Sequence, residues 1–216
     1  MATKAQVYAV LADDTARRIT GDYLDWAAFL GTSSRLYKYP FRDQLLIYAQ
    51  RPDATACAGY DLWNNTMHRY IRRGSKGIAL LTAGSGGMGV RYVFDVSDTG
   101  VRRGSRNVEP WQLSEQTEQP VREMLEKNFD ADAAMPLAEQ IHQIANQQAL
   151  AYWRDHRRDI LDSVADSFLS EYDEFNIGAS FRQAAAASIA YSLQLRCGLE
   201  PELYREDIAE VMNFNT

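Results

Sequence analysis

The spacing of apolar residues predicts helices near the start of the chain. Residues 14–30 carry apolar side chains at helical spacing, and Gly31 follows as a residue type that commonly ends a helix. A second helix is predicted over residues 41–50, because Pro40 favours a helix start and Pro52 prevents continuation. The spacing places on its buried face Phe41, Leu45, Tyr48 and Ala49, and on its other face Asp43, Gln44, Gln50 and Arg51.

Shorter segments with alternating apolar residues predict a small antiparallel sheet in the middle of the chain. The predicted strands span residues 67–73, 78–83 and 90–96. The predicted turns are residues 74–77, 84–89 and 98–100. The side chains expected to share one face of the third strand are Val90, Tyr92, Phe94 and Val96.

Beyond residue 120 the pattern becomes helical, after a predicted linker over residues 108–120. The predicted helices span residues 121–129, 137–166, 179–197 and 201–212. The chain is therefore expected to have an α+β fold, with N-terminal helices and a small antiparallel sheet followed by an all-helical C-terminal region. We expect two domains, residues 1–113 and 114–216.

Charge separates the same two regions. The net charge of the chain is -6. Residues 1–113 carry 15 Lys and Arg against 10 Asp and Glu, a balance of +5, whereas residues 114–216 carry 8 against 19, a balance of -11. The first region would attract a polyanion and the second would repel one.

Composition and motif searches exclude several classes of protein. Hydrophobic residues make up 46% of the 216 residues, which is sufficient for a buried core. There is no apolar run of membrane-spanning length and no secretory signal pattern, so a cytoplasmic protein without membrane insertion is expected. Cys57 and Cys197 form neither a metal-binding spacing nor a disulfide framework.

No motif of this chain predicts a cofactor or a catalytic centre. Residues 84–89 match GxGxxG, but a strand and not a helix is predicted after them, so a dinucleotide site is not supported. The histidines lie in no zinc-binding spacing. We therefore expect no metal, no cofactor and no enzymatic activity, although a fragment of an enzyme whose catalytic residues lie elsewhere remains an alternative.

Two segments of the basic region interleave cations with tyrosines. Cations neutralise phosphates, and aromatic rings stack on unpaired bases, so this mixture is typical of surfaces that bind single-stranded nucleic acid. The candidate residues of the first segment are Arg35, Tyr37, Lys38, Tyr39 and Arg42. Those of the second segment are Arg69, Tyr70, Arg72, Arg73 and Lys76.

Each segment also has a purely structural explanation. The second could be a charged hairpin edge that prevents aggregation, and the aromatic residues of the first could anchor the chain on the core. We expect Phe41 and Trp63 in the core and Tyr37 and Tyr39 exposed.

Residues 26–81 resemble the N-terminal, single-strand-DNA-binding domain of the ArdC-like antirestriction family. The resemblance rests on Tyr39, Phe41 and the segments 43–50, 51–55, 59–63 and 73–78. Residues 159–182 are similar to the region that follows this domain in large conjugative-element proteins of Gram-positive bacteria. The HExxH motif of many ArdC-like proteins is absent from this sequence, so their metalloprotease activity is not implied.

The resemblance and the charge pattern together predict sequence-tolerant binding of single-stranded DNA in mobile-element transfer or antirestriction. The acidic helices would then dock a protein partner, or shield the DNA-binding groove when DNA is absent. The alternative function is a protein-interaction module that inhibits or recruits a host enzyme through the acidic helical region. In the first case the basic residues carry the function, and in the second case the acidic residues do.

Overall fold

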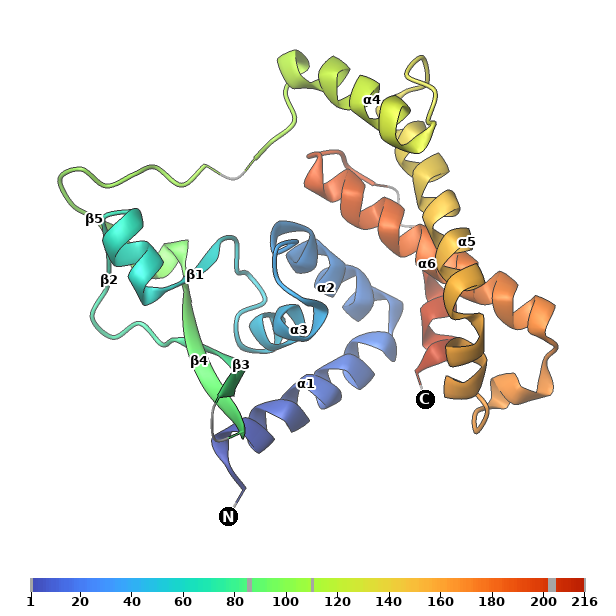
Figure 1. Cartoon of the computed structure of the whole chain (residues 1–216), viewed down its shortest axis with the longest axis horizontal. Helices are drawn as coiled ribbons and strands as arrows, with labels where there is room; N and C mark the ends of the chain where they lie inside the picture. The colour runs from blue at the N-terminus through green and yellow to red at the C-terminus, as the bar shows by residue number, and fades with distance from the viewer. Residues whose placement is uncertain (1, 85–86, 110, 202–204, 216) are drawn as a thin grey trace. The chain divides into compact units, whose positions relative to one another are not determined.

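The computed structural model describes residues 2–84, 87–109, 111–201 and 205–215. The chain has an α+β fold with a small antiparallel sheet and a helical C-terminal region, which confirms the predicted class (Figure 1). It divides into two compact units. The first, here called the sheet unit, comprises Met1–Arg18 and Gly31–Trp111; the second, the helical unit, comprises Ile19–Leu30 and Gln112–Thr216.

Two helices occupy the start of the chain where one was predicted. They are α1 (Lys4–Thr20) and α2 (Tyr23–Arg35). The chain breaks between them because the Asp22 carboxylate accepts hydrogen bonds from the backbone N–H groups of Leu24 and Asp25, as a helix N-cap does. The predicted stop at Gly31 is wrong, since α2 continues to Arg35. The Thr32 and Ser34 side chains in this last part of the helix are buried.

The helix α3 (Phe41–Gln50) has the predicted bounds, and Leu45 and Tyr48 are buried as predicted. Leu46 and Ile47 are fully buried in the core. Phe41, predicted to be in the core, is 54% exposed. Asp43, predicted to be on the exposed face, is buried because its carboxylate pairs with Arg91 at 2.7 Å.

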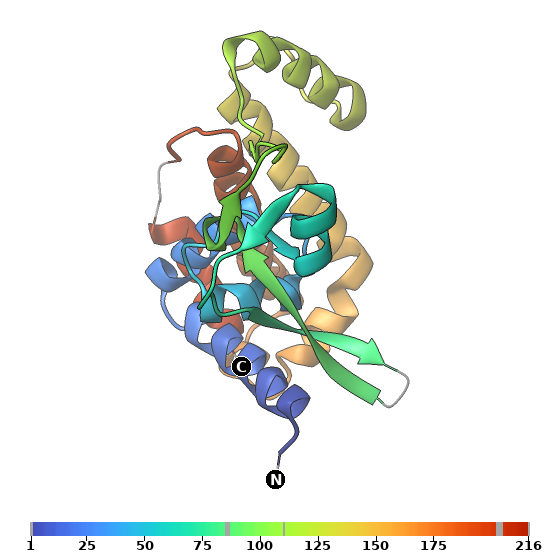
Figure 2. The same cartoon turned by 90° about the vertical axis from the view of Figure 1, so that its left-hand side faces the viewer.

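The three predicted strands are present, together with two that were not predicted. A three-stranded antiparallel sheet has the order β1 (Cys57–Gly59), β4 (Gly87–Asp95), β3 (Ile78–Gly84), and β3 and β4 form a twisted hairpin (Figure 2). A separate antiparallel pair consists of β2 (Arg69–Ile71) and β5 (Thr99–Val101). In the predicted turn at residues 84–89, Ser85 and Gly86 lie outside the described residues.

The core of the sheet unit lies between α1, α3 and the three-stranded sheet. Leu80 of β3 and Val93 of β4 pack there with Leu46 and Ile47 of α3. Within β4, Val93 points into this core and is buried, whereas Tyr92 is 45% exposed. Trp63 lies in a π-helical turn, η1 (Leu62–Thr66), and is buried as predicted, with its indole N–H donating to the Phe94 carbonyl at 2.8 Å.

The helical unit is built on two long antiparallel helices, α5 (Leu137–Ser163) and α6 (Glu174–Arg196), which run side by side (Figure 1). The remaining elements of this unit are α4 (Glu115–Phe129), η3 (Phe168–Glu171), α7 (Arg205–Ile208) and η4 (Ala209–Phe214). The predicted linker is shorter than expected, because α4 begins at Glu115 and includes Pro120. Trp26 of α2 belongs to this unit, and its indole N–H donates to Ser188 of α6.

The core between α5 and α6 is formed by small and branched aliphatic side chains. Its buried members are Leu137, Ile141, Ala145, Ala149, Ala186 and Ala190. Among the described helices, none is both long enough and apolar enough to cross a membrane.

Candidate nucleic-acid interface

The pairing of β2 with β5 brings together two basic segments that lie thirty residues apart in the sequence. Tyr70 is opposite Gly100 at the centre of the pair, with Arg69 opposite Val101 and Ile71 opposite Thr99. Because the strands are antiparallel, the segment that follows β2 and the segment that follows β5 leave the pair at opposite ends.

The same sequence follows both strands. Residues 72–75 and residues 102–105 both read Arg-Arg-Gly-Ser, and each is followed by a cation, Lys76 or Arg106. We call these segments the two basic turns. Their glycines have positive φ angles, 91° at Gly74 and 82° at Gly104, a conformation that favours glycine.

Matching backbone hydrogen bonds show that the two basic turns have similar conformations. The N–H of Ser75 donates to the Arg72 carbonyl at 3.2 Å, and the N–H of Ser105 donates to the Arg102 carbonyl at 2.9 Å. The second arginine of each turn, Arg73 and Arg103, is exposed. The strand pair therefore carries two similar cationic loops.

The first arginine of each turn is held by the protein backbone. Arg72 donates from Nη1 to the Ser97 carbonyl at 3.1 Å. Arg102 donates from Nε to the His68 carbonyl at 3.0 Å and from Nη2 to Asn64. These hydrogen bonds fix the first residue of each turn, whereas the following arginines, Arg73 and Arg103, are exposed.

The Tyr70 ring lies across the strand pair between the two turns. A Cβ atom added to Gly100 would lie 2.3 Å from Cζ of Tyr70, so the ring packs directly on the Gly100 backbone. Gly100 is buried under this ring, whereas Tyr70 itself remains 47% exposed. An aromatic ring supported by backbone and open to solvent is suited to stacking on a base.

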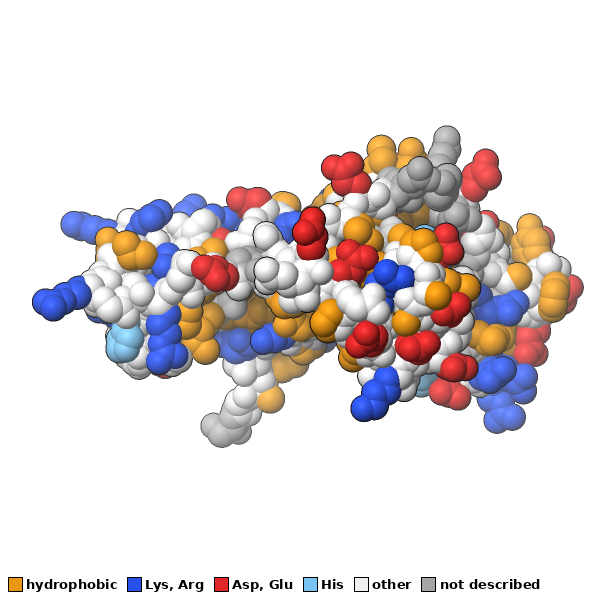
Figure 3. Space-filling model, turned by 90° about the horizontal axis from the view of Figure 1, so that it is seen from above, with side chains coloured by type: hydrophobic (Ala, Val, Ile, Leu, Met, Phe, Trp, Pro, Cys, Tyr) orange, Lys and Arg blue, Asp and Glu red, His pale blue; other side chains and the backbone are white. Residues whose placement is uncertain are grey.

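Lys and Arg side chains gather at the end of the sheet unit that carries β2 and β5 (Figure 3). The cations of the strand pair and its turns are Arg69, Arg72, Arg73, Lys76, Arg102, Arg103 and Arg106. The first four were predicted from the sequence, and the last three were not, because they adjoin a strand that was not predicted. The repeated Arg-Arg-Gly-Ser sequence was the signal that could have indicated them.

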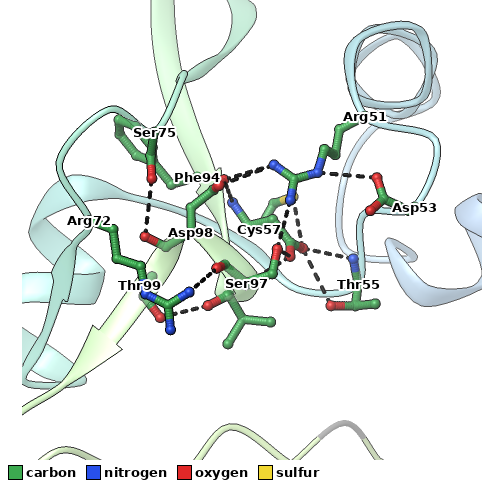
Figure 4. Close-up of polar contacts among 12 residues, drawn as sticks. Arg51, Asp53, Thr55, Cys57, Arg72, Ser75, Phe94, Ser97, Asp98 and Thr99 are labelled. Atoms are coloured by element: carbon green, nitrogen blue, oxygen red, sulfur yellow. Dashed lines mark hydrogen bonds and ion pairs between the residues drawn. The ribbon is translucent and has the colours of Figure 1, made fainter.

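A buried polar network holds β5 against the rest of the sheet unit (Figure 4). Asp95 is 2% exposed, and its carboxylate accepts hydrogen bonds from the backbone N–H groups of Thr55, Ala56 and Ser97 at 2.7, 3.0 and 2.9 Å. Burial raises the pKa of Asp95, but the hydrogen bonds from Ser97, Thr55 and Ala56 outweigh it and leave the pKa below its usual value. Asp95 is therefore a structural carboxylate, charged at neutral pH.

The second acid of this network, Asp98, pairs with Arg51, the residue that follows α3. Arg51 binds the Asp98 carboxylate at 3.1 Å, and this hydrogen bond raises the pKa of the guanidinium above its usual range. The Asp98 carbonyl accepts from the backbone N–H of Arg72 and from the Ser75 hydroxyl, which ties the first basic turn to the network. Asp98 lies beside the basic turns, but its carboxylate is engaged by Arg51.

The other predicted segment, residues 35–42, lies between α2 and α3, on different elements from the strand pair. Arg42, at the start of α3, pairs with Asp13 of α1 at 3.8 Å. Arg51, just past the end of α3, reaches Asp98. Arg42 belongs to the first predicted segment, and the Asp98 that Arg51 contacts lies beside the second. The ten residues of α3, roughly 15 Å of helix, lie between these two contacts.

Within residues 35–42, the side chains divide into structural and exposed ones. Arg35 donates from Nε to the Ala54 carbonyl at 3.0 Å. The expected exposure of Tyr39 is wrong: the side chain packs on the core, and its hydroxyl donates to the Cys57 carbonyl at 2.7 Å. Burial, with the nearby Cys57, raises the pKa of Tyr39 to about 12. Tyr37 is exposed as expected, and Lys38 Nζ lies 5.7 Å from its ring centroid.

Comparison with protein-family models, curated proteins and solved structures gives no match to this chain. Over the part of the chain that the structure describes, no group of three or more His, Cys, Asp and Glu side chains is placed to hold a metal ion.

Proposed function

We propose that the sheet unit binds single-stranded DNA, with little sequence preference, on the surface formed by β2, β5 and the two basic turns. The observation that carries this proposal is the half-exposed Tyr70 ring, supported by Gly100 and placed between two similar cationic loops. The resemblance of residues 26–81 to the ArdC-like DNA-binding domain supports the same function, in mobile-element transfer or antirestriction.

The chemistry of the surface explains a preference for unpaired strands. A base can stack on the exposed face of Tyr70 only if it is not already stacked within a duplex, and such stacking contributes about 1–3 kcal/mol per base. Exposed Arg73, Lys76, Arg103 and Arg106 would neutralise phosphates on either side of that base. Neither contact reads base identity, so the binding would tolerate many sequences.

Of the predicted residues between α2 and α3, Tyr37 and Lys38 are exposed and would extend the surface for a longer strand. Arg35 and Tyr39 make structural hydrogen bonds, so we assign them to the fold. Arg42 is the intermediate case, because it is exposed but paired with Asp13.

The stacking role is tested most sharply at Gly100, because the Gly100→Ala substitution changes no charge and no aromatic group. The added Cβ would lie 2.3 Å from Tyr70, so the ring must leave its place. Gly59→Ala in β1 is the matched control, since a Cβ there meets nothing within 4 Å. Affinity for a short oligothymidine is measured by fluorescence anisotropy for Gly100→Ala, Gly59→Ala and Tyr70→Ala.

We expect Gly100→Ala and Tyr70→Ala each to weaken binding by about 1–3 kcal/mol, and Gly59→Ala to have little effect. If both Tyr70→Ala and Gly100→Ala bind DNA as the unmodified chain does, the stacking role is wrong. Folding is checked by the near-ultraviolet circular dichroism of each variant, so that a loss of binding is not confused with unfolding.

A second candidate function is protein docking on the helical unit, and one cavity favours it. This cavity of about 350 Å³ lies between η3, the start of α6 and η4. Its lining combines the exposed rings of Phe168 and Tyr172 with the Glu210 side chain. Aromatic rings beside a carboxylate are suited to an arginine side chain of a partner protein.

Docking at this cavity is tested with an arginine-containing peptide and its citrulline analogue, which has the same shape but no charge. We expect the arginine peptide to bind at least tenfold more tightly, and Glu210→Gln to abolish the difference while Glu206→Gln on α7 preserves it. Equal binding of the two peptides would contradict this second function.

A further inference from the structure

The repeated Arg-Arg-Gly-Ser turns suggest more than a general basic surface. An antiparallel strand pair has a local two-fold axis through its centre, here between Tyr70 and Gly100. Each basic turn begins one residue after the last residue of its strand, β2 or β5, so the axis relates one turn to the other. The Tyr70 ring, which packs on Gly100, lies close to that axis.

The two turns also offer the same groups to a ligand. Each has a positive-φ glycine preceded by an exposed arginine, and each continues into a further exposed cation. Glycine allows a close approach of the backbone to an anion, and arginine supplies several donors in a planar arrangement that matches phosphate oxygens. Both turns are therefore suited to the same anion.

Different residues support the two turns. The first turn is held from η2 (Val96–Asp98), through the Ser97 and Asp98 carbonyls. The second is held from the end of η1 and the residues after it, since the Ser105 hydroxyl donates to the His68 carbonyl at 2.6 Å and the N–H of Arg106 donates to the Met67 carbonyl at 2.9 Å. The hydrogen bonds that hold each turn therefore come from residues other than Arg73 and Arg103, the side chains that the test below replaces.

The spacing of the turns sets the length of strand that could join them. Arg72 and the position opposite Arg102 are four residues apart along the pair, which is roughly 14 Å at about 3.4 Å per residue. Phosphates in a stacked strand are separated by about 3.4 Å along the helix axis, so about four nucleotide steps cover this distance, and fewer do in an extended strand.

We propose that the two basic turns are equivalent phosphate sites, and that one DNA strand of about four to five nucleotides bridges them with a base stacked on Tyr70. This inference rests on the proposed DNA binding and specifies how the strand is held. It assigns the same role to Arg103 in the second turn as to Arg73 in the first.

The test compares Arg73→Gln and Arg103→Gln, a matched pair because both side chains are exposed and both precede a positive-φ glycine. Arg17→Gln on α1 controls for the loss of one positive charge from the same unit. Binding of the full chain to oligothymidines of two to eight nucleotides is measured by competition against a labelled strand.

We expect the unmodified chain to gain at least tenfold in affinity between two and five nucleotides, as the strand becomes long enough to reach both turns. Arg73→Gln and Arg103→Gln should weaken binding of the longer strands equally, within about twofold, and should flatten the gain with length. Arg17→Gln should retain the full gain.

The result that overturns the inference is an Arg103→Gln variant that binds every length as the unmodified chain does while Arg73→Gln does not. Equal, small losses in all three variants would also overturn it, because the turns would then act only through net charge. If no strand of any length binds at low salt, the proposed DNA binding itself is wrong. The two failures are therefore distinguishable.

Discussion

The two units of this chain use their charged residues in opposite ways. The sheet unit carries 15 Lys and Arg against 8 Asp and Glu, and the helical unit carries 8 against 21. The sheet unit encloses three of its acids: Asp43 pairs with Arg91, Asp98 pairs with Arg51, and Asp95 binds backbone N–H groups. The core of the helical unit between α5 and α6 is aliphatic, and most of that unit's acids are exposed.

This difference explains how the sheet unit presents a basic surface. The Asp43 and Asp98 carboxylates are engaged by Arg91 and Arg51, and the Asp95 carboxylate by backbone N–H groups, and not by the arginines of the two basic turns. The lesson is that the buried acids and the exposed cations of the sheet unit belong to one arrangement.

The largest effect is expected for Asp95→Ala in the sheet unit. The substitution leaves the backbone N–H groups of Thr55, Ala56 and Ser97 without their acceptor, so we expect a loss of about 3 kcal/mol in the free energy of unfolding. Urea denaturation measures it. Asp53→Ala is the control, since the side chain of this acid is exposed and pairs with Arg51 at the surface, and should cost less than about 1 kcal/mol. Equal losses in the two variants would show that the network is not the support of β5.

The next largest effect is expected for Gly178→Ala in the helical unit, where the substitution adds a steric clash and removes no hydrogen bond. In Gly178→Ala, the new Cβ would lie 2.6 Å from the Trp153 ring. We expect a loss of about 1–2 kcal/mol, because overpacking exceeds the gain in helix propensity. Thermal unfolding of Gly178→Ala in a Trp153→Leu background should show a smaller loss, and an unchanged loss would place the strain elsewhere.

The two free cysteines report the electrostatics of the two units. Burial, followed by the charge of Asp95, raises the pKa of Cys57 in the sheet unit to about 12. Burial also raises the pKa of Cys197 in the helical unit, but Arg196 opposes this. Because the thiolate is the reactive form, iodoacetamide at pH 8 should label Cys197 at least tenfold faster than Cys57. Mass spectrometry of the labelled peptides measures both rates, and equal rates would contradict this assignment.

The smallest effect is the pH dependence that Asp95 contributes. Its pKa is lower in the folded chain than in the unfolded one, so its stabilisation is fully present above the unfolded value of about 3.9. That stabilisation is lost as the pH falls through the folded pKa. We expect the difference in urea midpoint between the unmodified chain and Asp95→Asn to narrow as the pH falls from 5 to about 2.5. A difference that stays constant over this range would show that folding does not lower the pKa of Asp95.

Elements bounded by strong local signals could be predicted from the sequence. Helix α3 lies between Pro40 and Pro52, and the structure gives it the predicted bounds. Strand β5 could not be predicted, because Gly100 in a three-residue segment is typical of a turn. Gly100 lies in a strand because Tyr70, thirty residues earlier, covers it. The contact between Tyr70 and Gly100 forms only when β2 and β5 pair, so neither local sequence predicts it.

The candidate site shows the same limit. The cations of residues 69–76 could be identified by their density in the sequence, and the structure places them at one end of the sheet unit. Tyr39 was misassigned because its hydroxyl donates to the Cys57 carbonyl. Cys57 lies in β1, a strand that was not predicted. Asp43 and Asp95 were missed as buried acids because apolar periodicity carries no information about partners such as Arg91.

The most direct test of DNA binding by the sheet unit is the salt dependence of affinity, measured on the full chain with a short fluorescent oligothymidine. The whole chain is needed because residues 19–30 belong to the helical unit, so a cut after residue 113 would remove their packing partners. Each phosphate neutralised on a single strand contributes about -0.7 to the slope of log K against log salt. If roughly three to five of the cations contact phosphates, the slope should be about -2 to -3.5. The absence of saturable binding at low salt, or a slope near zero, would contradict the account.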